Sequence, residues 1–307
     1  MSRMTVANII LLFVAFIWGA TFVVVQNAIA FLEPHSFNSF RFLMAAVLLL
    51  GWLLLFKREQ MKALDRKFLL SACLLGFWLF TGYALQTLGL LYTTSSKAGF
   101  ITGLSVVLVP LLSFFILKVK PGMNAIAGVC IATAGLYLLT MAGDTGINFG
   151  DVLVFGGAVG FAMQIIYTGQ YTTKYPALLL TVVQIICVFL FSGICAFLFE
   201  DWQKVVDPEI VLRPEVIIAL VITSVLATAF AFLAQTYFQK YTTATHTALI
   251  FSTEPVFAAL TAFVFAGERL GMNGITGSLC ILGGMILAEL PAKRRKIKTR
   301  QAEKRVI

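Results

Sequence analysis

The chain has 307 residues, of which 60% are hydrophobic and only 12% charged, and this excludes an ordinary soluble domain, whose surface needs more charge. The net charge of +9 does not indicate nucleic-acid binding, because the basic residues gather in short segments between apolar runs. These runs are unbroken instead of alternating, so they predict membrane-spanning helices and exclude a membrane barrel.

Ten transmembrane helices are predicted in chain order. A helix needs about 20 apolar residues to cross a bilayer, and such runs cover residues 8–30, 36–56, 68–91, 96–117, 124–142, 150–171, 178–199, 215–237, 243–265 and 272–290. The first run is long enough to span, so we interpret it as an uncleaved helix and not as a signal peptide. The longest connection, 200–214, is too short for a soluble enzyme domain. The expected fold class is an all-α integral membrane protein.

Basic residues are distributed unevenly between the two sides of this predicted bundle. Alternate connections and the termini hold 18 of the 23 basic residues, whereas the other connections hold four of them and most acidic residues. The positive-inside rule then places both termini in the cytoplasm, in agreement with an even number of crossings. We expect a multi-pass protein of the inner membrane of a bacterium, with residues 291–307 as a basic cytoplasmic tail that contacts anionic lipid headgroups.

A short sequence match indicates an internal repeat. Segment 86–94 recurs 149 residues later as segment 235–243, with five of nine positions identical (Gln, Thr, Tyr, Thr and Thr). Each copy closes the third or the eighth predicted helix and opens the next, which pairs residues 8–142 with residues 150–290. Because each half holds five helices, the second half enters the membrane from the opposite side. Two inverted five-helix repeats are typical of secondary transporters, and a duplicated membrane scaffold is the alternative.

Four motifs along the chain carry a family resemblance. They are Trp18-Gly19-Ala20-Thr21-Phe22, Arg41-Phe42, Ala98 to Leu104 with Pro110, and Glu254 to Leu260 followed by Gly267-Glu268-Arg269-Leu270. Together they resemble the EamA family of the drug/metabolite transporter superfamily, as two EamA domains that cover nearly the whole chain. The resemblance implies a ten-helix exporter or permease of the cytoplasmic membrane, often for amino acids or related metabolites. The first half departs from the pattern, because Ser105-Val106 stands where the second half has Glu254-Pro255.

Glu254 is the first candidate for a transport site. It lies near the middle of the predicted helix 243–265, where an ionisable group is costly unless it faces a cavity or a partner. Thr247 and Thr261 lie seven residues to either side, so that one stripe of this helix is polar. Two roles remain open: Glu254 binds a substrate ammonium or a coupling proton, or it hydrogen-bonds backbone opened by Pro255.

Aromatic side chains on other helices are candidates for a cavity wall. Steps of four residues place Trp18 with Phe22 on one helix face and Trp78 with Gln86 on another, with Tyr83 alongside. Such a face binds amphipathic solutes. Trp and Tyr are equally common as belt residues at a membrane interface.

Three more side chains are polar at positions within predicted helices. Gln164 and Tyr167 are one turn apart in 150–171 and either line a cavity or hold helices together. Arg41 lies about one turn into 36–56, near the predicted periplasmic end. We expect it to snorkel to the interface, and attraction of a substrate carboxylate is the alternative.

The inverted repeat predicts a secondary active or facilitative transporter that works by alternating access. The resemblance to the EamA family implies export of a small metabolite, such as an amino acid or derivative. The sequence has no P-loop motif, histidine cluster or metal-ligand spacing, so we predict no enzyme activity, cofactor, metal or use of ATP. The expected partner is a small-molecule substrate, with protons, membrane lipids and a second copy of the chain as further candidates. A flippase for a lipid-linked carrier is the alternative function.

Overall fold

The computed structural model describes residues 3–118, 120–140, 148–201, 204, 207–266 and 271–289. Within these ranges the regular structure is helical throughout, with no β-strand. The elements are α1 (Arg3–Ile29), α2 (Pro34–Phe56), η1 (Arg58–Ala63), α3 (Arg66–Gly89), α4 (Ser95–Gly103), α5 (Ser105–Leu117), α6 (Met123–Thr140), α7 (Phe149–Tyr171), α8 (Ala177–Phe199), α10 (Pro208–Val211), α11 (Pro214–Ile222), η2 (Thr223–Phe230), α12 (Ala231–Phe238), η3 (Gln239–Tyr241), α13 (Ala244–Phe251), α14 (Glu254–Ala266) and α15 (Met272–Glu289). The predicted tail 291–307 and the motif Gly267 to Leu270 lie outside the described residues.

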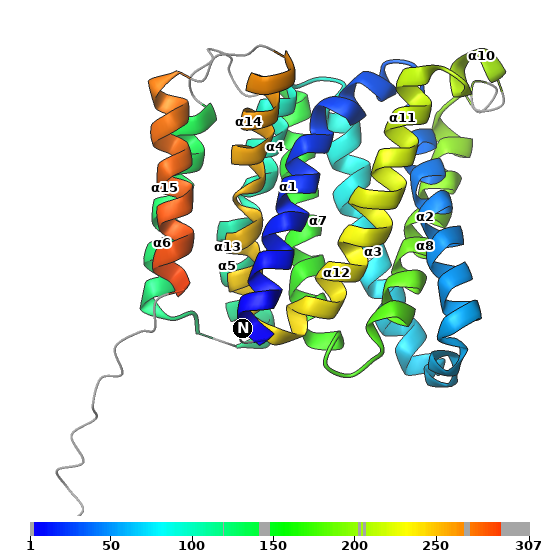
Figure 1. The fold of residues 1–307 in the computed structure, drawn as a ribbon, viewed down its shortest axis with the longest axis horizontal. Helices are drawn as coiled ribbons and strands as arrows, with labels where there is room; N and C mark the ends of the chain where they lie inside the picture. Colours follow the sequence, from blue (N-terminus) through cyan, green and yellow to red (C-terminus); the bar gives the residue numbers. More distant parts are fainter. Residues whose placement is uncertain are drawn as a thin grey trace, which may run out of the picture.

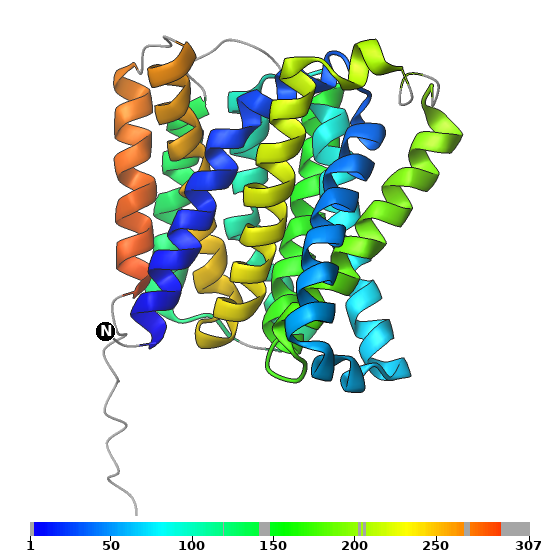
Figure 2. The ribbon, with the colours of Figure 1, turned by 45° about the vertical axis from the view of Figure 1, so that its right-hand side comes forward.

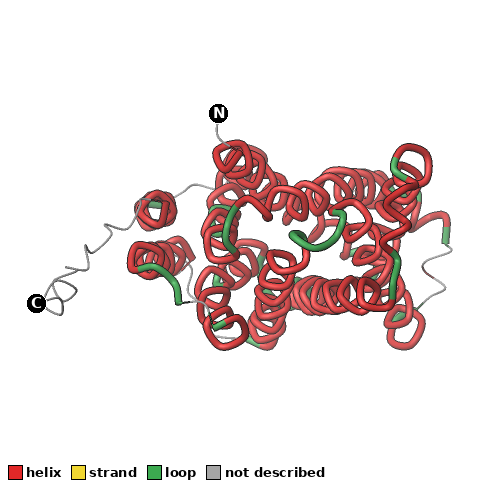
Figure 3. Tube along the Cα trace, turned by 90° about the horizontal axis from the view of Figure 1, so that it is seen from below, coloured by secondary structure: helices red, strands yellow, loops and turns green. Residues whose placement is uncertain are grey.

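The long helices stand side by side as one bundle (Figures 1 and 2). We call the face where α1 begins and α2 ends the lower face, after its place in Figure 1, and the opposite face the upper face. Figure 3, seen from below, shows the helices nearly end-on. The bundle geometry satisfies backbone hydrogen bonds within each helix, as a lipid environment requires.

Seven segments in the described part of the chain are long and apolar enough to cross a membrane. They are Arg3–Ile29, Pro34–Phe56, Arg66–Gly89, Lys97–Leu117, Phe149–Tyr171, Ala177–Phe199 and Pro214–Tyr241, with shorter apolar helices at Met123–Gly135 and Ile275–Gly284. Large apolar side chains such as Leu55 and Phe199 are exposed on the outside of the bundle. A surface of this kind suits lipid and not water. The predicted class, an all-helical membrane protein, is thereby confirmed.

Three segments that the sequence predicts as single helices change their form along their length. The segment 96–117 is divided at Leu104 into α4 and α5, and 243–265 is divided at Ser252 and Thr253 into α13 and α14. The second break precedes Pro255, which has no amide hydrogen to continue a helix. The segment 215–237 passes through a π-helix, η2, in which hydrogen bonds span five residues, so that the Ala231 amide donates to the Leu226 carbonyl.

Small residues allow two helix pairs to approach very closely. In the pair of α3 and α7, a Cβ atom on Gly160 would lie 2.6 Å from the backbone nitrogen of Gly82. In the pair of α6 and α15, which forms one edge of the bundle in Figure 1, a Cβ atom on Gly135 would lie 2.6 Å from the Gly277 carbonyl oxygen. Close backbone contact supplies the van der Waals attraction that holds helices together in lipid.

We expect Gly160→Ala to lower the free energy of unfolding by about 1–3 kcal/mol, since the added methyl group overpacks the contact between α3 and α7. The matched control is Gly51→Ala in α2, where nothing lies within 4 Å of the new Cβ atom. The control should be neutral or more stable by up to about 1 kcal/mol, because alanine favours the helix. Thermal unfolding of both purified variants measures the difference, and equal melting temperatures would contradict the packing argument.

On the upper face, the end of α8 holds the beginning of α2. The Glu200 carboxylate accepts hydrogen bonds from the His35 amide (2.7 Å), the Ser36 amide (2.8 Å) and the Ser36 hydroxyl (2.7 Å). These amides have no partner within α2, and a negative charge suits the positive end of the helix dipole. Nearby, the exposed Lys204 ammonium donates to Glu33 at 2.7 Å, and this carboxylate raises the pKa of Lys204.

Glu200→Ala should destabilise the protein by about 1–2 kcal/mol, the usual effect of removing a helix N-terminal cap. Glu59→Ala, which removes the same charge from an exposed site on the lower face, is the control and should leave stability within about 0.5 kcal/mol. Chemical or thermal unfolding in detergent tests the difference. If the two variants unfold alike, Glu200 does not stabilise α2.

Candidate functional site

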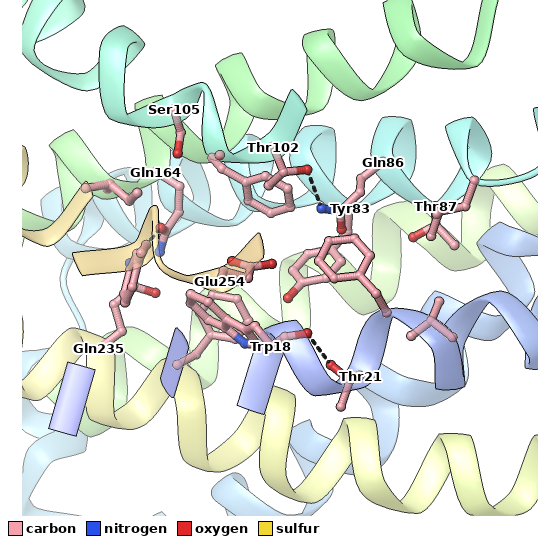
Figure 4. A pocket seen from close by; sticks show the side chains of 18 of the residues that line it. Trp18, Thr21, Tyr83, Gln86, Thr87, Thr102, Ser105, Gln164, Gln235 and Glu254 are labelled. Atoms are coloured by element: carbon pink, nitrogen blue, oxygen red, sulfur yellow. Dashed lines mark hydrogen bonds between the residues drawn. The ribbon is translucent and has the colours of Figure 1, made fainter. Parts of the chain in front are cut away.

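A cavity lies in the interior of the bundle, enclosed by helices from both halves of the chain (Figure 4). The centre of a water-sized molecule can move within about 70 Å³ of it, which is room for a compact ligand or a few waters. Its lining combines aromatic rings with polar side chains: Trp18, Thr21, Phe22, Val25, Arg41, Tyr83, Gln86, Thr87, Leu90, Thr102, Gly103, Ser105, Phe161, Gln164, Ile165, Phe232, Gln235, Phe251 and Glu254.

Most of the residues selected from the sequence meet in this cavity. Seven of the ten candidates line it: Trp18, Phe22, Arg41, Tyr83, Gln86, Gln164 and Glu254. The other three lie elsewhere. Trp78 packs edge-on against Phe77 with ring centroids 5.3 Å apart, Tyr167 stacks on Tyr171 at 5.8 Å, and Thr247 is fully buried in α13. The structure thus brings together candidate side chains from five predicted helices.

Glu254 is the first residue of α14, directly after the break in its helix. Its side chain is 8% exposed and projects into the middle of the cavity in Figure 4. Among the described residues, its carboxylate has no hydrogen bond and no ion pair, so the predicted bond to opened backbone is absent there. Ser105, the repeat equivalent of Glu254, lines the same cavity. Glu254 is therefore a buried carboxylate available to a ligand.

Arg41 does not snorkel to the membrane interface. Its side chain is 3% exposed and lines the cavity because α3 and η2 enclose it, so the predicted snorkelling is wrong. Nε donates to Thr228 Oγ1 at 2.7 Å, and Nη2 donates to the Tyr83 hydroxyl and the Ala227 carbonyl at 3.3 Å each. The guanidinium also lies over the Tyr83 ring, 4.7 Å from its centroid.

All of these partners of Arg41 are neutral. The ion pairs between described residues are Lys97 with Asp151 and Lys204 with Glu33, and neither reaches Arg41 or Glu254. A buried charge without a counter-charge is costly, and in membrane proteins such a group marks a substrate or ion pathway. The cavity therefore offers one cation and one carboxylate that the described protein groups leave unmatched.

The π-helix η2 supplies a backbone acceptor at the cavity wall. The Ala227 carbonyl accepts hydrogen bonds from Trp18 Nε1 at 2.8 Å and from Arg41 Nη2 at 3.3 Å. π-helical turns interrupt the usual pattern in which each carbonyl bonds the amide four residues later, and they are frequent at functional sites. This one carbonyl connects α1, α2 and η2 beside the cavity.

Side-chain amides close the lower end of the cavity. Gln235 Nε2 donates to Gln164 Oε1 at 3.0 Å, Gln164 Nε2 donates to Gln184 Oε1 at 3.3 Å, and Gln239 Nε2 donates to the Ile165 carbonyl at 2.6 Å. These bonds join α7, α8, α12 and η3. Sequence reasoning did not select Gln235, although the repeat pairs it with Gln86, which was selected.

An ion pair joins two helices near the upper face. Lys97 Nζ of α4 lies 2.5 Å from Asp151 Oδ2 of α7, and the Thr93 hydroxyl donates to Asp151 Oδ1 at 2.8 Å. Asp151 is buried. The cavity thus lies between a neutral hydrogen-bond network below and a charged contact above.

A bundle of apolar helices around a buried polar cavity is the architecture of a multi-pass membrane transporter. The chain belongs to the EamA-like transporter family, whose model matches residues 5–141 and 148–290. A protein of Archaeoglobus fulgidus named "Uncharacterized transporter" is 33% identical over 284 residues, which cover 92% of this chain and 86% of the relative. "Uncharacterized transporter YoaV" of Bacillus subtilis is 21% identical, with 92% of this chain and 97% of the relative covered.

A solved crystal structure has the same fold. It superposes with a TM-score of 0.78 at 18% sequence identity and covers 95% of this chain and 99% of the other. The likeness establishes the fold alone. Family membership confirms the resemblance read from the four motifs, and it assigns the protein to membrane transporters of small molecules, which are not generally enzymes.

Proposed function

We propose that the protein exports a small zwitterionic metabolite of the amino-acid class by alternating access. The observation that carries this proposal is the presence of Arg41 and Glu254 in one cavity, each without an ionic partner among the described residues. A guanidinium binds a carboxylate through paired hydrogen bonds, and a carboxylate binds an ammonium group. Tyr83 lines the cavity with Arg41 and Glu254, and its hydroxyl accepts a hydrogen bond from Arg41 Nη2. A ligand with both groups would neutralise the two buried charges at once.

The remaining lining suits the rest of such a molecule. Trp18, Phe22 and Phe232 present apolar ring surface, and Thr102 and Ser105 add hydroxyl groups. The small free volume favours a compact solute over a bulky one. Direction of transport rests on the family resemblance, which points to export.

We infer further that the chain spans the membrane ten times as two inverted repeats, residues 8–142 and 150–290. Support comes from the helix breaks, because Leu104 and Thr253 are separated by the same 149 residues as the sequence match. The packing is also reciprocal: α3 lies against α7, and α1 lies against α11, η2 and α12. Broken helices at equivalent positions of two halves are typical of transporters whose site lies between the repeats.

Alternating access then requires the two ends of the cavity to open in turn. The Lys97–Asp151 pair would part when the upper end opens, and the bonds of Gln235 and Gln239 would part when the lower end opens. The basic connections of the lower face support, by the positive-inside rule, our proposal that both termini lie in the cytoplasm of a bacterial cell. Export therefore runs from the lower to the upper face.

Purified protein in liposomes tests the function. We would measure efflux of labelled amino acids beside matched amines and carboxylic acids that lack one of the two charges. The proposal requires faster flux of the zwitterions. Lipid scrambling without solute flux would favour the flippase, and absence of both activities would favour the scaffold.

A further inference from the structure

A second hollow lies outside the cavity, at the lower end of the bundle. The centre of a water-sized molecule can move within about 610 Å³ of it. We call it the α12 groove. Its walls come from α1, the end of α2, η1, the turn before α8, and the stretch from η2 to η3: Ile10, Trp52, Lys57, Gln60, Thr172, Tyr175, Pro176, Ala177, Leu178, Phe230, Leu233, Ala234, Tyr237, Phe238 and Lys240.

The α12 groove is separate from the cavity, because the two share no lining residue. Helix α12 stands between them. Phe232 and Gln235 line the cavity, whereas Leu233 and Tyr237 line the groove. A ligand in the groove would therefore not occupy the place of a transported solute.

The wall of the groove is apolar and faces outward. Trp52 is 54% exposed and Tyr237 is 44% exposed, and Phe230 beside them is also exposed. On a membrane protein, side chains in these positions meet acyl chains, and Trp and Tyr lie at the level of the lipid headgroups. An acyl chain can thus lie in the groove along α12, and the groove ends at the membrane interface.

The rim of the groove is positively charged. Lys57 and Lys240 line it, and neither has an ion pair with a described residue. Lys240 Nζ lies 4.2 Å from the centroid of the Tyr237 ring, which holds the ammonium at the mouth of the groove. Gln60 lines the same rim, and its Oε1 atom is buried without a hydrogen-bond partner in the structure. Two cations and one unsatisfied acceptor match a phosphodiester with a hydroxylated headgroup.

We propose that the α12 groove binds one anionic phospholipid, with its phosphate between Lys57 and Lys240 and an acyl chain along α12. The neighbouring Arg58, Lys62, Arg66 and Lys67 add to the positive field of the lower face and would attract such a lipid. The bound lipid would join α2 and α12. The proposal does not depend on which solute the protein transports.

Native mass spectrometry of the full-length protein in detergent tests this site, with phosphatidylglycerol and phosphatidylcholine as probes. Wild type should retain one phosphatidylglycerol in preference to phosphatidylcholine. The double variant Lys57→Gln/Lys240→Gln should bind phosphatidylglycerol about 10- to 30-fold more weakly, since each lysine near a membrane surface contributes several-fold. The control, Lys62→Gln/Lys67→Gln, removes the same charge from exposed positions outside the groove and should bind as wild type does.

A variant that fills the groove tests whether the acyl chain lies there. Ala177→Phe fills the groove at the first turn of α8 without a change in charge and should also lose the lipid. An unchanged melting temperature without lipid shows that each variant is folded. Equal weakening by the control pair would show that the whole basic face attracts lipid, and it would overturn the proposal. Wild-type affinity in either groove variant, or equal binding of phosphatidylcholine, would overturn it too.

Discussion

Glu254→Gln is expected to reduce the flux of zwitterionic substrates about 10- to 100-fold, because a charge-assisted hydrogen bond contributes about 1.5–3 kcal/mol. Glutamine has nearly the same shape, and the Glu254 carboxylate has no described partner to lose, so the variant should fold normally. The measurement is the initial rate of efflux from liposomes at two pH values, with equal amounts of protein inserted.

The control for this variant is Glu59→Gln, which removes a carboxylate from the exposed η1. It should transport as wild type does. A substrate that lacks the ammonium group should be transported by Glu254→Gln no worse than by wild type. Flux that keeps its rate but loses its dependence on pH would assign Glu254 to a coupling proton in place of the ammonium. Unchanged flux at both pH values would leave Glu254 without a role in transport.

Arg41→Lys should reduce the flux of substrates that carry a carboxylate about 10- to 100-fold, although the charge is kept. Lysine cannot reproduce the planar fork with which Arg41 holds Thr228, Tyr83 and the Ala227 carbonyl. The ammonium group of the lysine variant would hydrogen-bond to these neutral partners instead, and it would therefore point away from the ligand. Efflux rates for an amino acid and for its decarboxylated amine measure the effect.

The two variants together distinguish the loss of a specific contact with the ligand from a general distortion of the cavity. Glu254→Gln should discriminate against the ammonium group, and Arg41→Lys should discriminate against the carboxylate. Thr228→Val, which removes one neutral partner of Arg41, should have a smaller effect in the same direction. If both charge variants slow every solute by the same factor, the cavity is distorted and the assignment of charges to ligand groups fails.

Hydropathy alone predicts most of the fold. The apolar runs 36–56 and 178–199 agree with α2 (Pro34–Phe56) and α8 (Ala177–Phe199) to within about two residues, since the loss of apolar character marks each end of a spanning helix. Hydropathy does not reveal breaks within an apolar run. The helix is interrupted at Leu104, which is itself an apolar residue, so no change in composition marks the interruption.

The cavity is predictable only in part, for a physical reason. Periodicity tells which side chains share a helix face, and this sufficed for Trp18 with Phe22. It does not tell which face turns inward. Arg41 has the depth of an interfacial residue along its own helix, but η2 and α3 cover it, and this contact between distant segments is not visible in a local pattern. Gln235 was within reach, because the repeat relates it to Gln86.

The two proposed repeats differ in charge at the cavity. Ser105 and Glu254 stand at equivalent positions and both line the cavity, yet only one is ionisable. In the repeats that we propose, the breaks at Leu104 and Thr253 are paired, while a single half carries the carboxylate.

The π-helix also determines how far the helix that follows it is rotated about its own axis. An α-helix advances about 100° per residue, and a π turn accommodates one residue more than an α turn. With a regular α-helix in place of η2, the following helix would turn by about this angle, and Phe232 and Gln235 would leave the cavity. The extra residue rotates the lower part of this helix relative to its upper part, so that Ala227 and Thr228 meet Arg41 while Phe232 and Gln235 line the cavity.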